Sequence, residues 1–200
     1  LLNIWPVEYD SASGTASYYP SVEITVQTRM GEERTAESTL EPGAYEYVII
    51  TSQSLEAPFQ DLVEWKRTRG LDHGGNITAR VVTVEWILDQ EEYWGDFGSH
   101  GGTGNDTQTL IRNFVADAHR TWGTEFLLLG GDHEIIPCRR VPVKGPLSDL
   151  IPTDLYYMGL DGDWDQDGDG RYGEGAGDGG GSSGEEADLI PEVWAGRATV

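Results

Sequence analysis

Apolar residues along the chain follow two patterns, one typical of buried strands and one typical of amphipathic helices. Tyr47–Thr51 and residues 126–129 are almost uninterrupted apolar runs, and residues 77–84 alternate and are rich in β-branched side chains. These stretches predict strands, the two continuous ones buried on both faces. Residues 58–69 and 105–119 lie between them and carry apolar side chains at helical spacing. This order predicts right-handed crossovers and therefore an α/β fold with a mostly parallel sheet flanked by helices.

The first 44 residues have a different pattern from the rest. Leu2, Ile4 and Pro6-Val7 begin an extended piece, residues 11–17 are small and polar as in a turn, and residues 22–26 alternate as in a half-exposed strand. We therefore expect residues 1–44 to form a short β-rich segment, either a β-hairpin or a fragment of an antiparallel sheet, with a polar linker.

The α/β part is expected over residues 45–200. Within it, residues 85–92 predict a short helix and residues 95–104 a glycine-rich loop. The stretch that begins at Trp194 reads as a strand that leaves the domain.

A candidate functional edge follows the apolar run of residues 126–129. Gly130 and Gly131 end the run, and Asp132, His133 and Glu134 come directly after them. In open α/β sheets, ligands gather just past the carboxyl ends of the strands, so these three polar residues are a possible substrate-contacting edge. An equally weighted alternative is a simple strand-to-loop turn in which Asp132 caps backbone amides.

The formal net charge of −22 narrows the range of partners. Such an acidic chain does not offer the basic surface that binds nucleic acid or an anionic membrane, and it favours cationic partners such as hard metal ions. No apolar run has the length of a membrane-spanning helix. The single cysteine, Cys138, cannot form an internal disulfide, and a loop residue is a more economical interpretation than a catalytic thiol.

The most specific motif is an acidic stretch of twelve residues from Asp163 to Glu174. Asp163, Asp165 and Asp167 stand at positions 1, 3 and 5 of the EF-hand calcium loop, with a glycine at position 6 and Glu174 at position 12. Alternate side chains of a tightly wound loop direct oxygens to one point. Asp169 would add its backbone carbonyl at position 7. Arg171 stands at position 9, where a water would supply the oxygen.

The surroundings of this stretch differ from those of a true EF-hand. Residues 158–162 are turn-like, so no amphipathic helix precedes the loop, and Gly170 replaces the usual apolar residue at position 8. We therefore expect one structural calcium loop within residues 161–174, to which Asp161 could add a further carboxylate. The alternative is a solvated acidic tract without a cation.

Taken in order along the chain, these motifs resemble the gingipain-like cysteine peptidases, which have a caspase-like fold. The resemblance covers residues 45–200 and rests on Tyr47–Thr51, Trp65-Lys66, Gly70, 111–114, Trp122-Gly123, 126–132, 135–137, 148–149, 154–157, 163–174 and 191–197. Residues 1–44 resemble the end of that family's β-rich pro-region. The family is known for stabilisation by calcium, which agrees with the acidic loop.

In that family the catalytic His and Cys follow the segment that resembles residues 191–197. Neither Cys138 nor His100 stands at a matching position, so the resemblance implies the first part of a catalytic domain without its dyad. It also implies a protein or peptide substrate, and a remaining part of the domain supplied in cis or by a separate chain.

Three functions follow as hypotheses. The first is a portion of a secreted or cell-surface cysteine endopeptidase that calcium stabilises. The second is a non-catalytic calcium-binding interaction or scaffold module. The third is a different hydrolase that uses Asp132 and His133 with a metal.

Overall fold

The computed structural model describes residues 7–10, 15–18, 40–69, 77–94, 106–142, 150–175 and 187–199. The chain divides into two compact units, Leu1–Gly31 and Glu32–Val200, which are described separately. None of the helices in these ranges combines the length and apolar character needed to cross a bilayer.

The first unit contains a β-hairpin. β1 (Val7–Asp10) pairs antiparallel with β2 (Thr15–Tyr18), so that Val7 lies opposite Tyr18. The second strand begins inside residues 11–17, which we expected to be a turn. Thr15 and Tyr18 belong to residue types that favour strands, and this preference outweighs the small polar character of their neighbours. The strand predicted over residues 22–26 lies outside the described residues.

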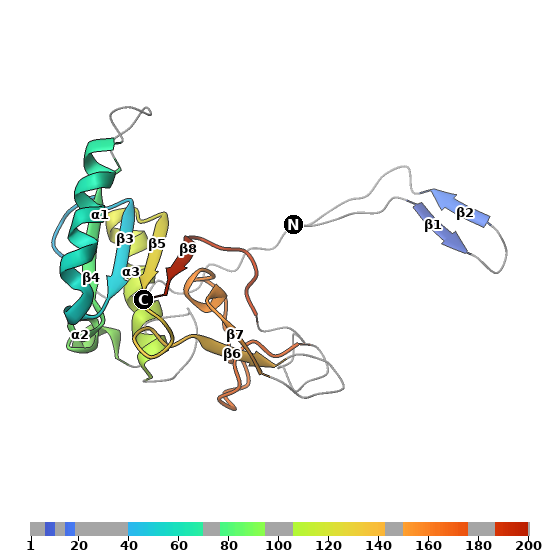
Figure 1. Cartoon of the computed structure of the whole chain (residues 1–200). Coiled ribbons are helices and arrows are strands. Elements are labelled where there is room, and N and C mark those ends of the chain that lie inside the picture. The colour runs from blue at the N-terminus through green and yellow to red at the C-terminus, as the bar shows by residue number, and fades with distance from the viewer. Residues whose placement is uncertain are drawn as a thin grey trace. The chain divides into compact units, whose positions relative to one another are not determined.

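The second unit is built on a four-stranded sheet in the order β4-β3-β5-β8. All three pairings are parallel, which confirms the predicted α/β class with a mostly parallel sheet. The strands are β3 (Tyr47–Thr51), β4 (Ala79–Thr83), β5 (Phe126–Gly130) and β8 (Trp194–Ala198). β8 does not leave the domain as the sequence suggested, because it pairs with β5 at the edge of the sheet (Figure 1).

Helices cover the two faces of this sheet. α3 (Thr107–Trp122) packs its apolar stripe against Val48 and Ile50 of β3 and Leu127 and Leu129 of β5, in one buried cluster. α1 (Glu56–Arg69), which follows the 3₁₀ turn η1 (Gln53–Leu55), lies over the other face (Figure 1). The ring of Phe59 leaves so little room there that a Cβ at residue 130 would come within 2.5 Å of it, so Gly130 allows the close approach.

The termini of α3 follow from the local sequence. The Asp106 side chain accepts a hydrogen bond from the backbone amide of Thr109 at 2.8 Å, which caps the first turn. Gly123 ends the helix in a left-handed conformation with φ of 69°. The helix begins two residues after the predicted start at residue 105 and ends three residues after the predicted end, at Trp122 instead of His119.

Shorter elements complete the unit. The helix predicted over residues 85–92 is divided into α2 (Val84–Leu88) and the 3₁₀ turn η3 (Glu91–Tyr93). β6 (Arg139–Pro142) and β7 (Leu150–Thr153) form an antiparallel ribbon that follows the carboxyl end of β5 along the chain. A 3₁₀ turn, η4 (Leu155–Tyr157), leads from this ribbon toward the acidic loop. The glycine-rich stretch 95–104 lies outside the described residues.

Candidate functional site

The carboxyl ends of β3, β5 and β8 meet at one edge of the sheet. Thr51 of β3 lies beside Gly130 of β5, which lies beside Ala198 of β8. The Thr51 hydroxyl donates to the Gly130 carbonyl at 2.6 Å, and the Gly131 amide donates to the Ala198 carbonyl at 2.8 Å. These bonds fix the point at which the chain leaves β5.

The turn after β5 carries the three predicted edge residues. The Asp132 carboxylate accepts a hydrogen bond from the Glu134 amide at 2.9 Å, as the capping alternative requires. The amides of Ile135 and Ile136 donate to the Asp132 carbonyl. His133 and Glu134 are exposed on this turn. The turn therefore presents His133 and Glu134 to solvent while Asp132 holds the backbone.

Arg197 of β8 holds the same turn through hydrogen bonds to its carbonyl oxygens. Its Nη1 donates to the carbonyl oxygens of Gly131, Asp132 and Ile136 at 2.9, 3.1 and 2.9 Å. Its Nε and Nη2 donate to the carboxylate of Asp154 at 2.9 and 2.6 Å. This ion pair raises the pKa of Arg197, so the side chain stays charged. One arginine thus connects the sheet edge, the turn after β5 and the residue that precedes η4.

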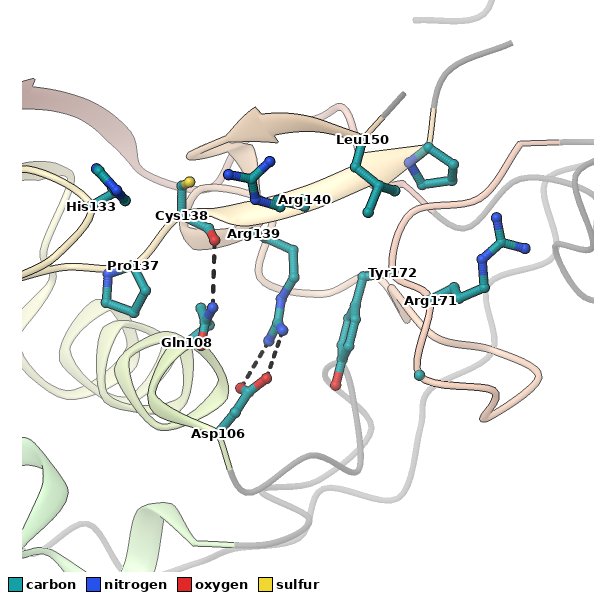
Figure 2. Close-up of a pocket in the computed structure, with 12 residues that line it drawn as sticks. Asp106, Gln108, His133, Pro137, Cys138, Arg139, Arg140, Leu150, Arg171 and Tyr172 are labelled. Carbon is teal, nitrogen blue, oxygen red and sulfur yellow. Dashed lines mark hydrogen bonds and ion pairs between the residues drawn. The ribbon is translucent and has the colours of Figure 1, made fainter. Parts of the chain in front are cut away.

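Two cavities adjoin this edge and share His133, Cys138 and Arg140. The first has a volume of about 440 Å³ and extends toward the acidic loop (Figure 2). The second has a volume of about 400 Å³ and extends toward Arg197. The first is lined by Asp106, Gln108, His133, Pro137, Cys138, Arg139, Arg140, Pro142, Leu150, Gly170, Arg171 and Tyr172. The second is lined by Asp132, His133, Cys138, Arg140, Pro152, Thr153, Asp154, Arg197 and Thr199.

Arg139 forms the inner wall of the first cavity. Its Nη1 and Nη2 donate to the two carboxylate oxygens of Asp106 at 2.7 and 3.0 Å (Figure 2). Its guanidinium also lies 4.3 Å from the ring centre of Tyr156 and 3.7 Å from that of Tyr172. Burial by itself lowers the pKa of Arg139, but the hydrogen bonds to Asp106 outweigh it, so the net shift is upward. This buried pair joins the start of α3 to β6.

The acidic loop is closely wound, as its sequence predicts. Asp163, Asp165, Asp167 and Asp169 each accept a hydrogen bond from a backbone amide two to five residues further on, at 2.7–3.2 Å. Gly168 has a φ of 74° and supplies the sharp turn. Asp165, Asp167 and Asp169 each offer a carboxylate oxygen within 4.8 Å of the other two. The loop therefore brings together the carboxylates of positions 3, 5 and 7.

The closing residue of the loop is buried. Glu174 is 0% exposed, and its Oε1 lies 2.5 Å from Nη1 of Arg171. Trp164 and Tyr172 pack into the core on the inner side of the loop, and the Gly173 amide donates to the Trp164 carbonyl at 2.7 Å. In this arrangement Arg171 neutralises the carboxylate that the sequence places at position 12.

A second group of carboxylates lies beside the loop. Asp161, Asp188 and Glu192 also offer oxygens within 4.8 Å of one another. The Leu160 amide donates to Glu192 at 2.5 Å. Burial raises the pKa of Asp188, and the neighbouring Asp161 carboxylate raises it further, while the Ile190 amide acts in the opposite direction. Sequence reasoning found Asp161 but missed the other two, because they are distant in the chain and follow no motif.

Arg112 of α3 holds the backbone between these two groups. Its side chain is 1% exposed, and Nε and Nη2 donate to the Gly159 carbonyl at 3.2 and 2.7 Å. Nη2 also donates to the Gly162 carbonyl at 2.8 Å. Burial lowers the pKa of Arg112. The spacing of apolar residues over 105–119 does not predict this role, because it gives no reason to expect a charged residue such as Arg112 on the buried side of α3.

The donor chemistry of both acidic groups fits a hard divalent cation. Carboxylate and carbonyl oxygens are the ligands that calcium takes, and several close carboxylates repel one another unless a cation lies among them. Within the described ranges, the groups of close ligand atoms contain neither His133 nor Cys138. The described part of the chain also gives no hydrogen bond between the Cys138 thiol and a histidine. His119, on α3, has its Nδ1 2.8 Å from the Thr124 carbonyl.

Comparison with protein families decides what this arrangement belongs to. Residues 40–200 match the model of peptidase family C25. The chain belongs to peptidase family C25. The resemblance to gingipain-like cysteine peptidases is thereby confirmed, and the parallel sheet flanked by helices is consistent with a caspase-like fold. Comparisons with curated proteins and with solved structures gave no significant match.

As a C25 chain, the molecule is a cysteine peptidase region, and the family implies a protein substrate. The match includes the whole described parallel sheet, the turn after β5 and the acidic loop. It begins near the predicted start of the α/β part at residue 45.

Proposed function

We propose that this chain is the first part of the catalytic region of a secreted or cell-surface cysteine endopeptidase that calcium stabilises. The observation that carries the proposal is the C25 match, which spans the sheet, its carboxyl edge and both acidic groups. In α/β sheets this edge is where substrates bind. The exposed residues His133 and Glu134, on the turn that Asp132 caps, would contact the peptide substrate there.

The nucleophile and its base are proposed to lie in the remaining part of the domain, in cis or on a separate chain. Cysteine catalysis needs a thiolate with an imidazole within hydrogen-bond reach. Cys138 has no histidine partner among the described residues, and His119 is engaged by the Thr124 carbonyl. What this part of the protein supplies is the binding edge and its rigid support from Arg197.

The exposed edge of β8 is the place where the remaining part of the domain would pack. β8 is the last strand of the described sheet, and Trp194 on it is 62% exposed. Leu189 and Ile190, just before it, are 61% and 62% exposed. Parallel sheets are normally covered on both faces, and open apolar edges favour association. The remaining part of the domain is therefore proposed to pack against β8.

Calcium would be held by the oxygens of the acidic loop. Asp165, Asp167 and Asp169 bring their carboxylates together within one tight turn, and the sequence places Asp163 and Glu174 at positions 1 and 12 of the motif. A bound cation would neutralise charges that otherwise repel. Its proposed role is structural, because the loop packs on the core through Trp164 while no reacting group lies in it.

The peptidase proposal is tested on the protein that carries the remaining part of the domain. We expect cleavage of a casein substrate that a thiol-alkylating reagent abolishes, with full activity retained by Cys138→Ser. The same assay on the chain of residues 1–200 alone should show no cleavage. Loss of activity in Cys138→Ser would contradict the placement of the nucleophile outside this chain.

The same experiment distinguishes the peptidase from the alternative function, a non-catalytic calcium-binding module. That alternative is favoured by the lack of a Cys–His pair among the described residues. If the protein with the remaining part binds calcium but cleaves no substrate under reducing conditions, the module interpretation replaces the peptidase. Cleavage by the chain alone that resists alkylation would instead indicate the metal hydrolase of Asp132 and His133.

A further inference from the structure

The charged residues around the two cavities balance one another almost completely. Each carboxylate that lines them in the described part of the chain already has a donor: Asp106 is bound by Arg139 at 2.7 and 3.0 Å, Asp154 by Arg197 at 2.9 and 2.6 Å, and Asp132 by the Glu134 amide at 2.9 Å. Arg171, at the far end of the first cavity, is paired with Glu174. Three of the four arginines at the cavities are therefore committed to internal acids.

Arg140 is the exception. It is exposed, it lines both cavities, and within the described residues it has no acidic partner. It follows Arg139 on β6, and successive residues of a strand point to opposite faces. Figure 2 shows the consequence, with Arg139 directed to Asp106 and the Arg140 guanidinium on the other side of the strand. In a chain of net charge −22, an arginine without an internal acid is conspicuous.

An apolar surface adjoins this guanidinium. Pro142 lies two residues further along β6 and so shares the face of Arg140. The ribbon places Pro152 opposite Arg140 and Leu150 opposite Pro142. Leu150 is 49% exposed, and both prolines line one cavity or the other. Among the described residues, this face therefore combines the unpaired guanidinium of Arg140 with a small apolar surface.

We propose that Arg140 and the apolar face of the β6–β7 ribbon form a subsite for an acidic side chain of a peptide, with an apolar neighbour of that residue on Leu150. A guanidinium binds a carboxylate through two parallel N–H donors, and the internal pairs of Arg139 and Arg197 show that geometry in the same cavities. The role of this subsite in substrate choice rests on the proposed peptidase function, whereas the binding itself does not.

The overall charge of the chain works against such a ligand, which makes the test informative. A negative protein repels an acidic peptide at long range, but at about 0.15 M salt this repulsion is screened beyond roughly 8 Å. Any preference for glutamate over glutamine must then come from a nearby cation. An exposed charge pair contributes up to about 1 kcal/mol, which corresponds to about a fivefold difference in Kd.

The experiment measures peptide binding to the calcium-supplemented chain of residues 1–200 by chemical-shift titration. One probe is a peptide capped at both ends with a central glutamate between leucines, and the matched probe has glutamine in its place. We expect the glutamate probe to bind about fivefold tighter, with shifts at His133 and Cys138 as well as Arg140. Arg140→Gln should abolish the preference, and Arg140→Lys should retain part of it.

Arg67→Gln is the matched control, because it removes the same charge from an exposed arginine on α1 that is paired with Glu64. This variant should keep the full preference. Equal binding of the two probes to the unmodified chain, or a preference that survives Arg140→Gln, would overturn the subsite. A third probe has the central glutamine and a free carboxyl terminus. If this probe binds and the glutamate probe does not, the ligand is a chain terminus, and the proposed subsite for an acidic side chain is overturned. None of these results depends on catalysis, which the alkylation experiment tests separately.

Discussion

The carboxyl edge of the sheet and the acidic loop differ in how the negative charges of their carboxylates are compensated. At the edge, Asp106 and Asp154 are each held by an arginine of the same chain through two hydrogen bonds. In the loop, Asp165, Asp167 and Asp169 approach one another, and within the described residues their hydrogen bonds come from backbone amides alone. Amides satisfy hydrogen bonds but leave the charges in place. The charges of Asp106 and Asp154 are therefore balanced within the chain, while those of the loop leave room for the proposed calcium ion.

Removing an internal cation should give the largest effect. Arg139→Met leaves Asp106 with an uncompensated charge in a partly buried site, and it also removes the guanidinium from Tyr156 and Tyr172. We expect a loss of about 2–3 kcal/mol in the free energy of unfolding, measured with urea, because Arg139 is buried whereas the Asp106 side chain is 43% exposed and partly screened by water. Arg140→Met, one residue away on the exposed face, should change this free energy by less than about 0.5 kcal/mol. Equal losses in both variants would contradict the structural role of Arg139 and the absence of such a role for Arg140.

Removing the external cation should give the next effect. Extracellular loops of this type bind calcium at about 10⁻⁴ to 10⁻³ M, so ten millimolar calcium would stabilise the fold by roughly 2 kcal/mol. We therefore expect a chelator to lower Tm by about 4–8 °C. Asp167→Ala should lower the Tm measured in calcium by a similar amount and make it insensitive to chelator.

Asp61→Ala is the control for that measurement, because it removes one negative charge from an exposed position on α1. This variant should keep the full response to chelator. Identical melting curves with and without chelator for the unmodified protein would remove calcium from the proposal. A response that persists in Asp167→Ala but disappears in Asp188→Asn would move the cation to the group of Asp161, Asp188 and Glu192.

The two regions also differ in how far the sequence reveals them. The loop is local, so the spacing of its acidic residues was enough to predict a tight turn with close carboxylates, which the structure shows for Asp165, Asp167 and Asp169. The strands were equally visible, because buried parallel strands such as Phe126–Gly130 are continuous apolar runs. What the spacing did not reveal is that the Asp169 carboxylate lies close to those of Asp165 and Asp167.

The edge depends on contacts between distant residues, which the sequence does not mark. Arg139 reaches Asp106 across 33 positions, and Arg197 reaches Asp154 across 43. Nothing in the residues beside Arg112 indicates that it bonds carbonyls 47 and 50 positions further on. The strand from Trp194 was predicted as an element but not as a member of the sheet, because pairing is decided by tertiary packing and not by the strand's own pattern.

The pair of Asp106 and Arg139 should also make the stability of the fold depend on pH. Burial raises the pKa of Asp106, but the hydrogen bonds from Arg139 and from Thr109 outweigh it, so the net shift is downward. A carboxyl whose pKa is lowered by folding stabilises the fold above its unfolded pKa of about 3.9 and loses that contribution as the pH falls through the folded value. Protonation of Asp106 is therefore expected to cost stability only in acid.

The measurement compares Asp106→Asn with the unmodified protein by urea unfolding from neutral pH to strongly acidic pH, without calcium. Asn can still cap α3, so we expect a difference of about 1–2 kcal/mol at neutral pH from the lost charge pair alone. The difference should shrink toward zero below about pH 4. Asp61→Asn is the control at an exposed position of α1, and at neutral pH it should cost less stability than Asp106→Asn. A constant difference for Asp106→Asn down to acid pH would show that the Arg139 pair contributes nothing electrostatic.

The smallest effect isolates the backbone geometry of the loop from its charges. Gly168 has a φ of 74°, and a Cβ there would meet no atom within 4 Å, so Gly168→Ala introduces conformational strain without a clash. We expect a loss of about 1 kcal/mol in the presence of calcium. Gly196→Ala in β8 is the matched control, since a Cβ there also meets open space and the backbone lies outside the left-handed region. Because alanine is favoured over glycine within a strand, this variant should be neutral or slightly stabilising. If Gly168→Ala proves equally neutral while the chelator response is intact, the cation does not require the sharp turn at position 6, and the loop binds through its carboxylates without the EF-hand geometry.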